Sequence, residues 1–426
     1  MAQLSDDCFA HDQRLMPLDE ALALLAERVV PVTGREMVPL GDGVDRILAE
    51  NLVTAIDVPG HDNSAVDGYA VYFDDLEPEA ETRLIVAGRI AAGHPLRRAA
   101  RRGEALRVFT GAAMPAGHDD SGPDTVFMQE DCRLDGDSVV VPPGIARGAN
   151  RRGAGEDVAA GATVLEAGRR LRPEDLGLAA AIGRSRLPVR RPLRVALFST
   201  GDEVRDPGAA LAEGAIYDAN RYAIGALLRR LGCAVTDLGI LTDDAAVVRD
   251  AIAAAARDHD LLLTSGGVSV GDEDHVKAAV EASGTLTFWR LAIKPGRPLA
   301  LGQVDDGDRK VPFVGLPGNP AAVMVTFVRL ARPLILRLSG ASQVAPSLYP
   351  VRAGFSHDKK PDRREFLRCR VSRAEDGIPV ATKAGRQGAG ILSAVSAADG
   401  LVELPEEMTY LEAGTLVDFL PFSEVS

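Results

Sequence analysis

The chain is poor in cysteine, and the few cysteines that it has do not cluster. Four occur among 426 residues, at Cys8, Cys132, Cys233 and Cys369, and no C-x-x-C pair is present. Such wide spacing argues against a structural zinc site. It also fits a protein of a reducing compartment, where thiols stay unpaired.

Long apolar runs, a targeting segment and an excess of positive charge are also missing. No apolar run reaches the roughly 18 residues that a membrane-spanning helix needs. The first residues, Met-Ala-Gln-Leu-Ser-Asp-Asp, have neither the basic region nor the apolar core of a signal peptide. We therefore expect a cytoplasmic protein that does not enter a membrane. The formal net charge of −13 argues against nucleic acid as a partner.

The most informative stretch runs from Leu261 to His275. It begins as a short apolar run that suits a buried strand, passes through a glycine-rich turn, and ends in acids before a helical pattern. Adjacent glycines followed by a helix N-terminus favour close approach of a phosphate. The acids, Asp272 to Asp274, would repel that phosphate unless a divalent cation lies between them. The alternative is an ordinary turn whose acids cap the helix dipole.

Strands and helices alternate from about residue 190, which predicts a parallel sheet with helices on both faces. The predicted strands are Leu193–Phe198, Ala234–Leu241, Leu261–Leu263 and Pro312–Leu316. Ligands bind such sheets at the carboxyl ends of the strands. The residues expected to gather there are Thr200 to Glu203, Asp243, Ser265, Gly266, Gly267, Ser269, Asp274, Lys294, Arg297 and Pro317 to Pro320. Acids, hydroxyls, glycines and cations in one place suit an anionic, metal-bridged ligand.

The flanking regions predict further domains. Short strand candidates between Gly/Pro turns indicate an inserted β-rich domain over 51–142. Residues 1–50 and 143–185 form an N-terminal helix and linker region, and 186–339 the α/β domain. Short strands after Gly340 indicate a separate small β barrel or sandwich over 340–426, of which we expect the barrel.

Two polar loops are open to more than one interpretation. Residues 57–70 hold His61, Asp62, Asn63, Ser64 and Asp67 among turn pairs, so they form either a surface loop or a site. Residues 150–157 combine arginine, glycine and acids, and a solvated linker is the favoured interpretation.

Together, six of these segments resemble the molybdopterin molybdenumtransferase family, which includes the E domain of gephyrin. The resemblance covers about residues 15–420. The segments that carry it are Asp62–Ala70, Asn150–Asp157, Ser199–Glu203, Thr264–Gly271, Lys294–Pro298 and Leu316–Pro320.

The resemblance implies an activity and an assembly. Such proteins take adenylylated molybdopterin and molybdate, cleave the adenylate with a divalent cation, here expected to be Mg²⁺, and release molybdenum cofactor. They are elongated homodimers of four-domain subunits, in which the linker region contributes to dimerisation. The site on the α/β domain is completed by the Asp67 loop of the partner subunit.

The resemblance also assigns roles to residues. It implies catalytic roles for Asp67, Thr110, Asp157, Glu203 and Asp274, and a cation held by Glu203, Asp243 and Asp274. The implied ligand-binding residues are Thr200, Ser265, Gly266, Gly267, Ser269, Lys294, Arg297, Pro317, Asn319 and Arg363. Transient partners would be the molybdopterin adenylyltransferase and apo-molybdoenzymes.

The chain departs from the family pattern at a few positions. Arg290 and Arg297 stand where relatives often have lysine, and Ala322 and Ala389 stand where relatives often have serine. The lost hydroxyls predict an altered oxyanion site. Two alternatives therefore stay open, a molybdopterin adenylyltransferase and a non-catalytic molybdopterin carrier or scaffold.

Overall fold

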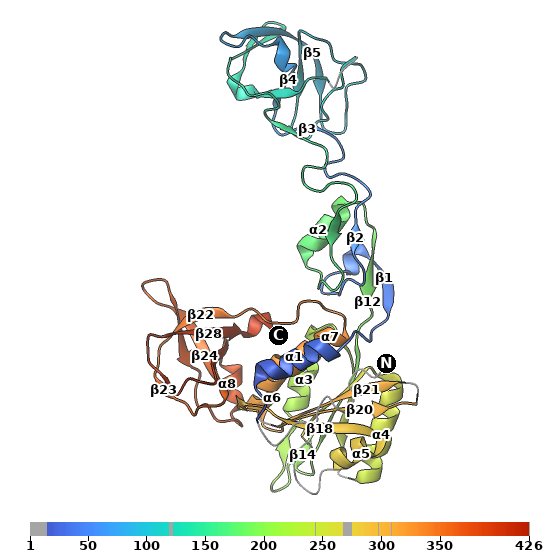
Figure 1. The fold of residues 1–426 in the computed structure, drawn as a ribbon, viewed down its shortest axis with the longest axis vertical. Coiled ribbons are helices and arrows are strands. Elements are labelled where there is room, and N and C mark those ends of the chain that lie inside the picture. The colour runs from blue at the N-terminus through green and yellow to red at the C-terminus, as the bar shows by residue number, and fades with distance from the viewer. Residues whose placement is uncertain are drawn as a thin grey trace.

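The computed structural model describes residues 15–118, 122–242, 244–266, 275–296, 298–307 and 309–425. The molecule is elongated, with an inserted β domain at one end and the α/β domain and a β barrel side by side at the other (Figure 1). A narrow connecting region lies between the two ends. Within the described residues, no helix combines the length and apolar character needed to cross a membrane.

The α/β domain is built on a six-stranded sheet in the order β16-β13-β17-β21-β20-β18. The strands are β13 (Arg194–Thr200), β16 (Ala234–Leu241), β17 (Leu261–Ser265), β18 (Gly284–Arg290), β20 (Pro298–Asp305) and β21 (Lys310–Leu316). The first four in spatial order are parallel, as predicted. β20 runs antiparallel to both of its neighbours, β21 and β18, so the sheet is mixed. We did not predict β20, because the prolines and the glycine of residues 294–298 indicate a turn and not the start of a strand.

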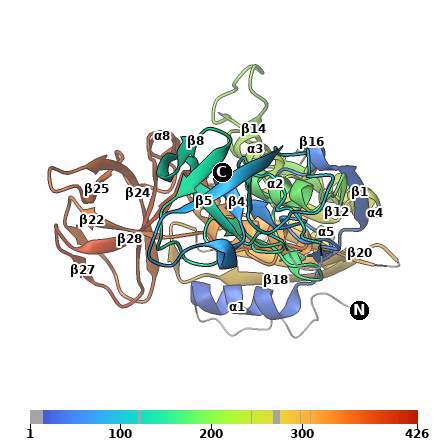
Figure 2. The ribbon, with the colours of Figure 1, turned by 90° about the horizontal axis from the view of Figure 1, so that it is seen from above.

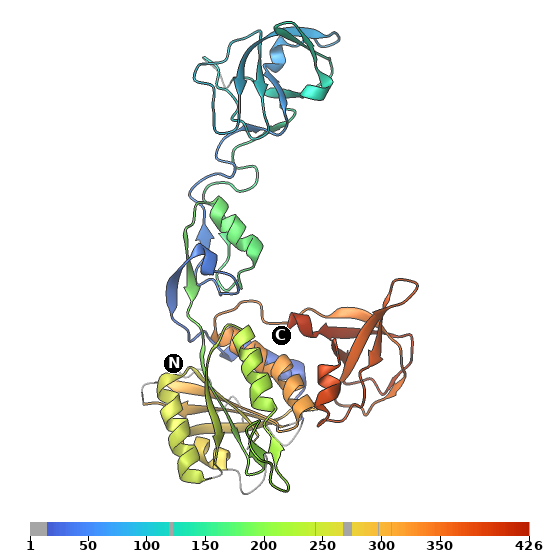
Figure 3. The same ribbon diagram turned by 180° about the vertical axis from the view of Figure 1, so that it is seen from behind.

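Helices cover both faces of this sheet (Figure 3). α4 (Ala245–Asp258) and α5 (His275–Ser283) pack on one face, where Val248, Ile252 and Val280 are buried. The other face carries α3 (Asn220–Arg230), α6 (Pro320–Thr326) and α7 (Arg332–Leu338). A short π-helical segment, Phe327–Ala331, joins the last two helices.

The N-terminal helix α1 (Leu18–Arg28) belongs to this second face. Its apolar side, Leu18, Ala21 and Leu25, is buried in the same core as Leu334 and Leu338 of α7. We expected this helix to group with the linker region. Its amphipathic pattern predicts an apolar stripe but does not say which core covers that stripe.

The connecting region and the inserted domain are mostly strands. In the connecting region β1 (Arg35–Pro39) pairs with β12 (Arg186–Arg190), and β2 (Leu52–Val53) pairs with β11 (Thr163–Leu165). Helix α2 (Pro173–Ala181) lies beside these pairs. The inserted domain is a sheet in the order β7-β4-β6-β5-β9-β8. Its strands are β4 (Gly68–Val71), β5 (Thr82–Ile90), β6 (Glu104–Val108), β7 (Thr125–Met128), β8 (Arg133–Asp135) and β9 (Ser138–Val141).

The C-terminal strands close into a barrel. Its strands are β22 (Tyr349–Ala353), β24 (Arg364–Arg373), β25 (Pro379–Lys383), β26 (Gly400–Leu404) and β28 (Leu416–Pro421), beside the short helix α8 (Leu392–Ser396). The pairing of β24 with β26 closes the ring. β19 (Ile293–Lys294) leaves the α/β domain and pairs with Arg364 and Glu365 of β24. Figures 1 and 2 both place the barrel beside the α/β domain.

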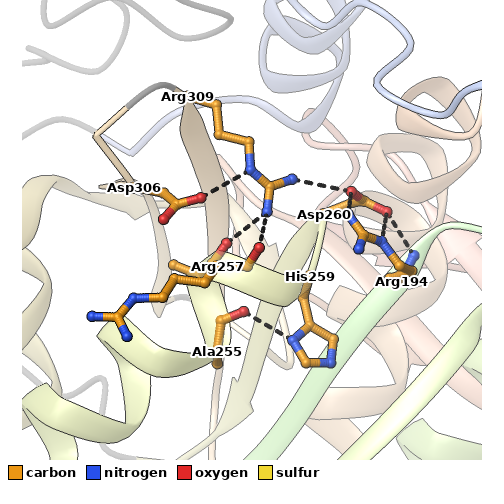
Figure 4. Close-up of polar contacts among 8 residues, drawn as sticks. Arg194, Ala255, Arg257, His259, Asp260, Asp306 and Arg309 are labelled. Carbon is orange, nitrogen blue, oxygen red and sulfur yellow. Dashed lines mark hydrogen bonds and ion pairs between the residues drawn. The ribbon is translucent and has the colours of Figure 1, made fainter.

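A polar cluster braces the amino-terminal edge of the α/β sheet (Figure 4). Arg194 donates to Asp260 through Nε at 3.0 Å and Nη2 at 2.7 Å. Arg309 lies 3.3 Å from the same carboxylate and 3.1 Å from Asp306, and the His259 ring contacts a carbonyl oxygen. Burial would raise the pKa of Asp260, but the hydrogen bonds from Arg194 outweigh it and leave that pKa below its usual value. Because these residues lie where β13 and β17 begin, they are on the opposite edge from the strand ends that bind ligands, and their role is structural.

Candidate functional site

A cavity of about 610 Å³ lies between the α/β domain and the barrel. The α/β domain contributes Glu203, Gly266, Lys294, Pro317, Asn319 and Ala322 to its lining. The barrel contributes Glu365, Phe366, Arg368, Gln387, Gly388 and Ala389. This volume is in the range of small-molecule sites, and the position is the carboxyl edge of parallel strands.

Five predicted ligand or catalytic residues therefore meet in one cavity, namely Glu203, Gly266, Lys294, Pro317 and Asn319. Thr200 and Ser265 line a smaller adjoining cavity of about 100 Å³, which shares Glu203 and Gly266 with the larger one. The strand-end prediction gathers these residues correctly, because β13, β17 and β21 are parallel and end at the same edge.

The start of the glycine-rich loop is held tightly. The Ser265 hydroxyl accepts from Asn220 Nδ2 at 3.0 Å, and Gly266 N donates to the Leu316 carbonyl at 3.2 Å. Gly266 has φ of +86°, and a Cβ there would lie 3.0 Å from the Thr200 carbonyl oxygen. The buried Thr200 hydroxyl has no hydrogen-bond partner among the described residues. An unpaired donor in a cavity of this kind is available to an anionic ligand.

Lys294 is fixed at the cavity by the barrel. Its Nζ donates to Glu365 Oε1 at 2.7 Å, and His357 Nε2 lies 3.2 Å from the same oxygen. Lys383 Nζ lies 3.2 Å from His357 Nδ1. Since a lysine ammonium only donates, Nδ1 is the acceptor and Nε2 carries the ring proton. Glu365 is 4% exposed. Its contact with His357 holds its carboxylate in place, and that carboxylate orients the Lys294 ammonium.

Arg368 is a cavity residue that the sequence analysis missed. It is 1% exposed, and burial lowers the pKa of its guanidinium below the usual value. Nη2 donates to the Gly388 carbonyl at 3.1 Å, while Nε has no hydrogen-bond partner among the described residues. A buried guanidinium without a full set of partners is a strong site for an oxyanion. The signal was present, since Arg368 is a charged residue within the apolar run Phe366, Leu367, Arg368, Cys369.

The predicted cation site lies partly within the described residues. Among the described residues no group of three or more His, Cys, Asp or Glu side chains is placed to hold a metal. Glu203 lines both cavities. The other predicted cation ligands, Asp243 and Asp274, lie outside the described residues, as do Gly267, Ser269 and Arg297. The Glu203 carboxylate, which has no hydrogen-bond or ion-pair partner among the described residues, fits one ligand of a hard cation.

Arg363 does not line the main cavity. It lies instead at a neighbouring cavity of about 520 Å³, whose lining includes Lys294, Glu365, Lys359 and Lys360. Because Lys294 and Glu365 border both cavities, Arg363 is near the site but on the far side of that ion pair.

Asp67, Thr110 and Asp157 are not at the cavity within one chain. They belong to the inserted domain and its neck, at the opposite end of the molecule (Figure 1). Asp67 Oδ1 accepts from both the backbone N and the hydroxyl of Thr110, each at 2.8 Å, and these bonds lower the pKa of Asp67. Asp157 has an exposed side chain.

The polar loops 57–70 and 150–157 lie together at the neck, where the inserted domain meets the connecting region. β3 (Asn63–Ser64) pairs with β10 (Arg151–Arg152), and Arg151 forms an ion pair with Asp62. Asp62 also accepts from Ala154 N at 2.7 Å, which is the main cause of its lowered pKa. Part of the polar density in these loops is therefore structural, and the favoured interpretation of 150–157 as a solvated linker is wrong for Arg151.

Comparison with known proteins agrees with this architecture. Residues 16–183 match the family described as MoeA N-terminal region (domain I and II), 196–337 the probable molybdopterin binding domain, and 350–422 the MoeA C-terminal region (domain IV). A molybdopterin molybdenumtransferase of Haemophilus influenzae is 38% identical over 413 residues, covering 96% of this chain and 100% of that protein. One from a Nostoc species is 35% identical over 387 residues, covering 89% of this chain and 87% of that protein.

A solved structure has the same fold. The molybdopterin biosynthesis moeA protein from Pyrococcus horikoshii OT3 superimposes with a TM-score of 0.80 and 28% identity, over 96% of this chain and 100% of that one. The domain matches, the relatives and the fold all agree: this chain belongs to the molybdopterin molybdenumtransferase family, transferases of molybdenum cofactor biosynthesis.

Proposed function

We propose that this protein inserts molybdenum into adenylylated molybdopterin and cleaves the adenylate with the help of Mg²⁺. The observation that carries the proposal is the cavity in which Glu203 meets two cations, Lys294, which is paired with Glu365, and Arg368. The names of the relatives supply the substrate class. The charged residues that line the cavity suit the charge of such a substrate.

Adenylate cleavage is the first half of the proposed reaction. Water adds to phosphorus, the P–O–P bond breaks, and AMP and molybdopterin phosphate leave. Bound Mg²⁺ would neutralise the phosphate oxygens. Glu203, with Asp243 and Asp274, would hold it, while Gly266 N and the Thr200 hydroxyl border the phosphate.

Molybdate binding is the second half. Arg368 would donate to the molybdate oxygens, and Lys294, held by Glu365, would add a second positive charge. Ala322 and Ala389 line the same cavity without hydroxyls, so the oxyanion has fewer donors here than serine would give. Arg363 and Arg297 would raise the local positive potential, since long-range attraction needs no direct contact.

The remote acids require a second subunit. We propose a homodimer in which the Asp67–Thr110 pair of one chain reaches the cavity of the other. Two observations support this arrangement: the pair belongs to the inserted domain, where the Thr110 side chain is exposed, and its own chain's cavity is at the other end of the molecule. Asp157 would act from the same neck. The resulting cofactor would pass to apo-molybdoenzymes in the cytoplasm, with the molybdopterin adenylyltransferase as the donor of substrate.

The test is release of AMP from adenylylated molybdopterin by Glu203→Gln. This change removes one cation ligand at nearly constant volume. We expect AMP release to fall by roughly 10²-fold or more, and higher Mg²⁺ to recover part of it. Glu213→Gln, at an exposed loop position, is the matched control. Full AMP release by Glu203→Gln would show that this carboxylate does not hold the cation.

A non-catalytic carrier is the second candidate, favoured by the two alanines in the cavity lining. A carrier would bind adenylylated molybdopterin without releasing AMP under any concentration of Mg²⁺. An adenylyltransferase would consume ATP instead.

A further inference from the structure

A second cavity, of about 430 Å³, lies where the connecting region, the α/β domain and the chain's C-terminal segment meet. Its lining includes four arginines and two acids: Arg170, Arg229, Arg230, Arg332, Asp45 and Glu424. None of them borders the cavity of the proposed active site.

Arg332 is the central group of this cavity. It is 8% exposed, and its terminal nitrogens donate hydrogen bonds to two carbonyl oxygens, those of Val344 at 2.9 Å and Glu424 at 3.3 Å. Its Nε is buried and has no hydrogen-bond partner among the described residues. Carbonyl oxygens do not neutralise a guanidinium, and the nearby charge of Glu424 offsets only part of the cost of burying this cation, since its pKa stays lowered.

Arg170 adds a second incomplete guanidinium. Its Nη2 lies 3.1 Å from Asp45 and donates to the Arg230 carbonyl at 2.9 Å, but its buried Nε has no partner among the described residues. The charge of Arg170 also contributes, after burial, to lowering the pKa of Arg332, so the two cations are close enough to repel each other.

The acids of the cavity do not balance these charges. Asp45 is engaged by Arg170 alone among the described residues. The Glu424 carboxylate accepts from the Tyr349 hydroxyl at 2.9 Å, which holds it beside the barrel. Among the described residues, four guanidinium groups against two carboxylates leave an excess of positive charge in a concave space.

We propose that this cavity, the arginine junction, binds the phosphate group of a small phosphorylated molecule. A phosphate dianion would add counter-charge between Arg170 and Arg332 and so offset the repulsion between their guanidinium groups. The cavity volume suits a small molecule better than a free anion. Because the lining comes from three parts of the fold, a bound ligand also fixes the connecting region to the α/β domain.

Equilibrium dialysis tests the proposal, with ribose 5-phosphate as the probe and ribose as the uncharged control. The full-length protein is used, and ribose 5-phosphate bound at the active-site cavity is the part of the binding that folded Arg332→Met and Arg170→Met retain. We expect a dissociation constant on the order of 1 mM or below for ribose 5-phosphate and no binding of ribose. Arg332→Met and Arg170→Met should each weaken binding roughly tenfold or more, because each removes a charge-assisted bond.

Arg133→Met, at an exposed ion pair in the inserted domain, should leave binding unchanged. Circular dichroism checks that each variant is folded, and two variants guard against one that fails to fold. Absence of binding to the starting protein, or equal binding by folded Arg332→Met and Arg170→Met, overturns the proposal. Inorganic phosphate bound as tightly as ribose 5-phosphate overturns the assignment to a phosphorylated small molecule.

Discussion

The side-chain amide of Gln387 pairs with the backbone of Arg368: Oε1 accepts from Arg368 N at 2.9 Å, and Nε2 donates to Arg368 O at 3.1 Å. This pairing holds the loop of Gln387, Gly388 and Ala389 against strand β24. It also positions the backbone from which the buried Arg368 side chain extends. Two residues that border the proposed oxyanion site are thus positioned by each other.

Gln387→Ala should raise the molybdate concentration needed for half-maximal cofactor formation. The change removes two hydrogen bonds, each worth roughly 0.5–1.5 kcal/mol, and loosens the Arg368 strand. AMP release at saturating substrate should stay within about twofold of the unmodified protein. Gln343→Ala, at an exposed position after helix α7, is the control. An unchanged molybdate requirement would mean that Gln387 does not position the oxyanion site.

Arg368→Met should separate the two halves of the proposed reaction. Methionine keeps the apolar stem but removes the oxyanion donor, so cofactor formation at micromolar molybdate should fall at least roughly tenfold. Because the guanidinium is desolvated and incompletely paired, thermal stability should not fall. Cofactor and AMP are measured in the same reaction. A parallel loss of both would assign Arg368 to cleavage and not to molybdate.

Ala322→Ser should improve molybdate binding. Ala322 borders the cavity and is 3% exposed, so a hydroxyl there would add one donor near the proposed oxyanion. One hydrogen bond is worth roughly 0.5–1.5 kcal/mol, or about 2- to 12-fold in affinity. Titration with molybdate measures the change. A weaker affinity would show that the cavity is already filled without the hydroxyl.

Asp67→Ala and Glu203→Gln should each inactivate a homodimer yet complement each other. In a mixed dimer, one of the two cavities receives both an intact Glu203 from its own chain and an intact Asp67 from the partner. Co-expressed, differently tagged chains purified as heterodimers should therefore recover activity. No recovery by heterodimers of confirmed composition would rule out a shared site.

Asp260→Asn should destabilise the α/β domain in a pH-dependent manner. The folded pKa of Asp260 is depressed, so its stabilisation is present above the unfolded pKa of about 3.9 and is lost as the pH falls through the folded pKa. At pH 7 we expect a loss of roughly 1.5–3 kcal/mol in the free energy of unfolding, which shrinks below about pH 4. Circular dichroism follows unfolding of the protein in urea. Asp258→Asn, at an exposed position, is the control, and an equal loss at pH 7 and pH 3 would contradict the assignment.

The sequence predicts the strand-end part of the site well and the rest poorly. Glu203, Gly266, Lys294 and Asn319 were expected together because parallel strands end at one edge, and this rule needs no knowledge of other domains. Arg368 was missed because its partner surface belongs to a different domain, and periodicity within a strand does not show which cavity that strand borders.

The connections between domains were equally hidden. α1 is buried in a core that it shares with residues more than 300 positions away in the sequence, such as Leu334 and Leu338 of α7. Likewise, the pairing of Asn63 with Arg152 turns two separate polar loops into one neck. Local composition indicates turn chemistry in such loops but not their partners.

Adenylate cleavage and molybdenum insertion are measured together in one reaction with the unmodified protein. Purified protein, adenylylated molybdopterin and Mg²⁺ are incubated with molybdate, and released AMP and active molybdenum cofactor are measured together. The account predicts both products from molybdate at micromolar concentration, and neither when Mg²⁺ is removed. Absence of AMP would contradict the proposed cleavage, and AMP without cofactor at any molybdate concentration would contradict the proposed insertion.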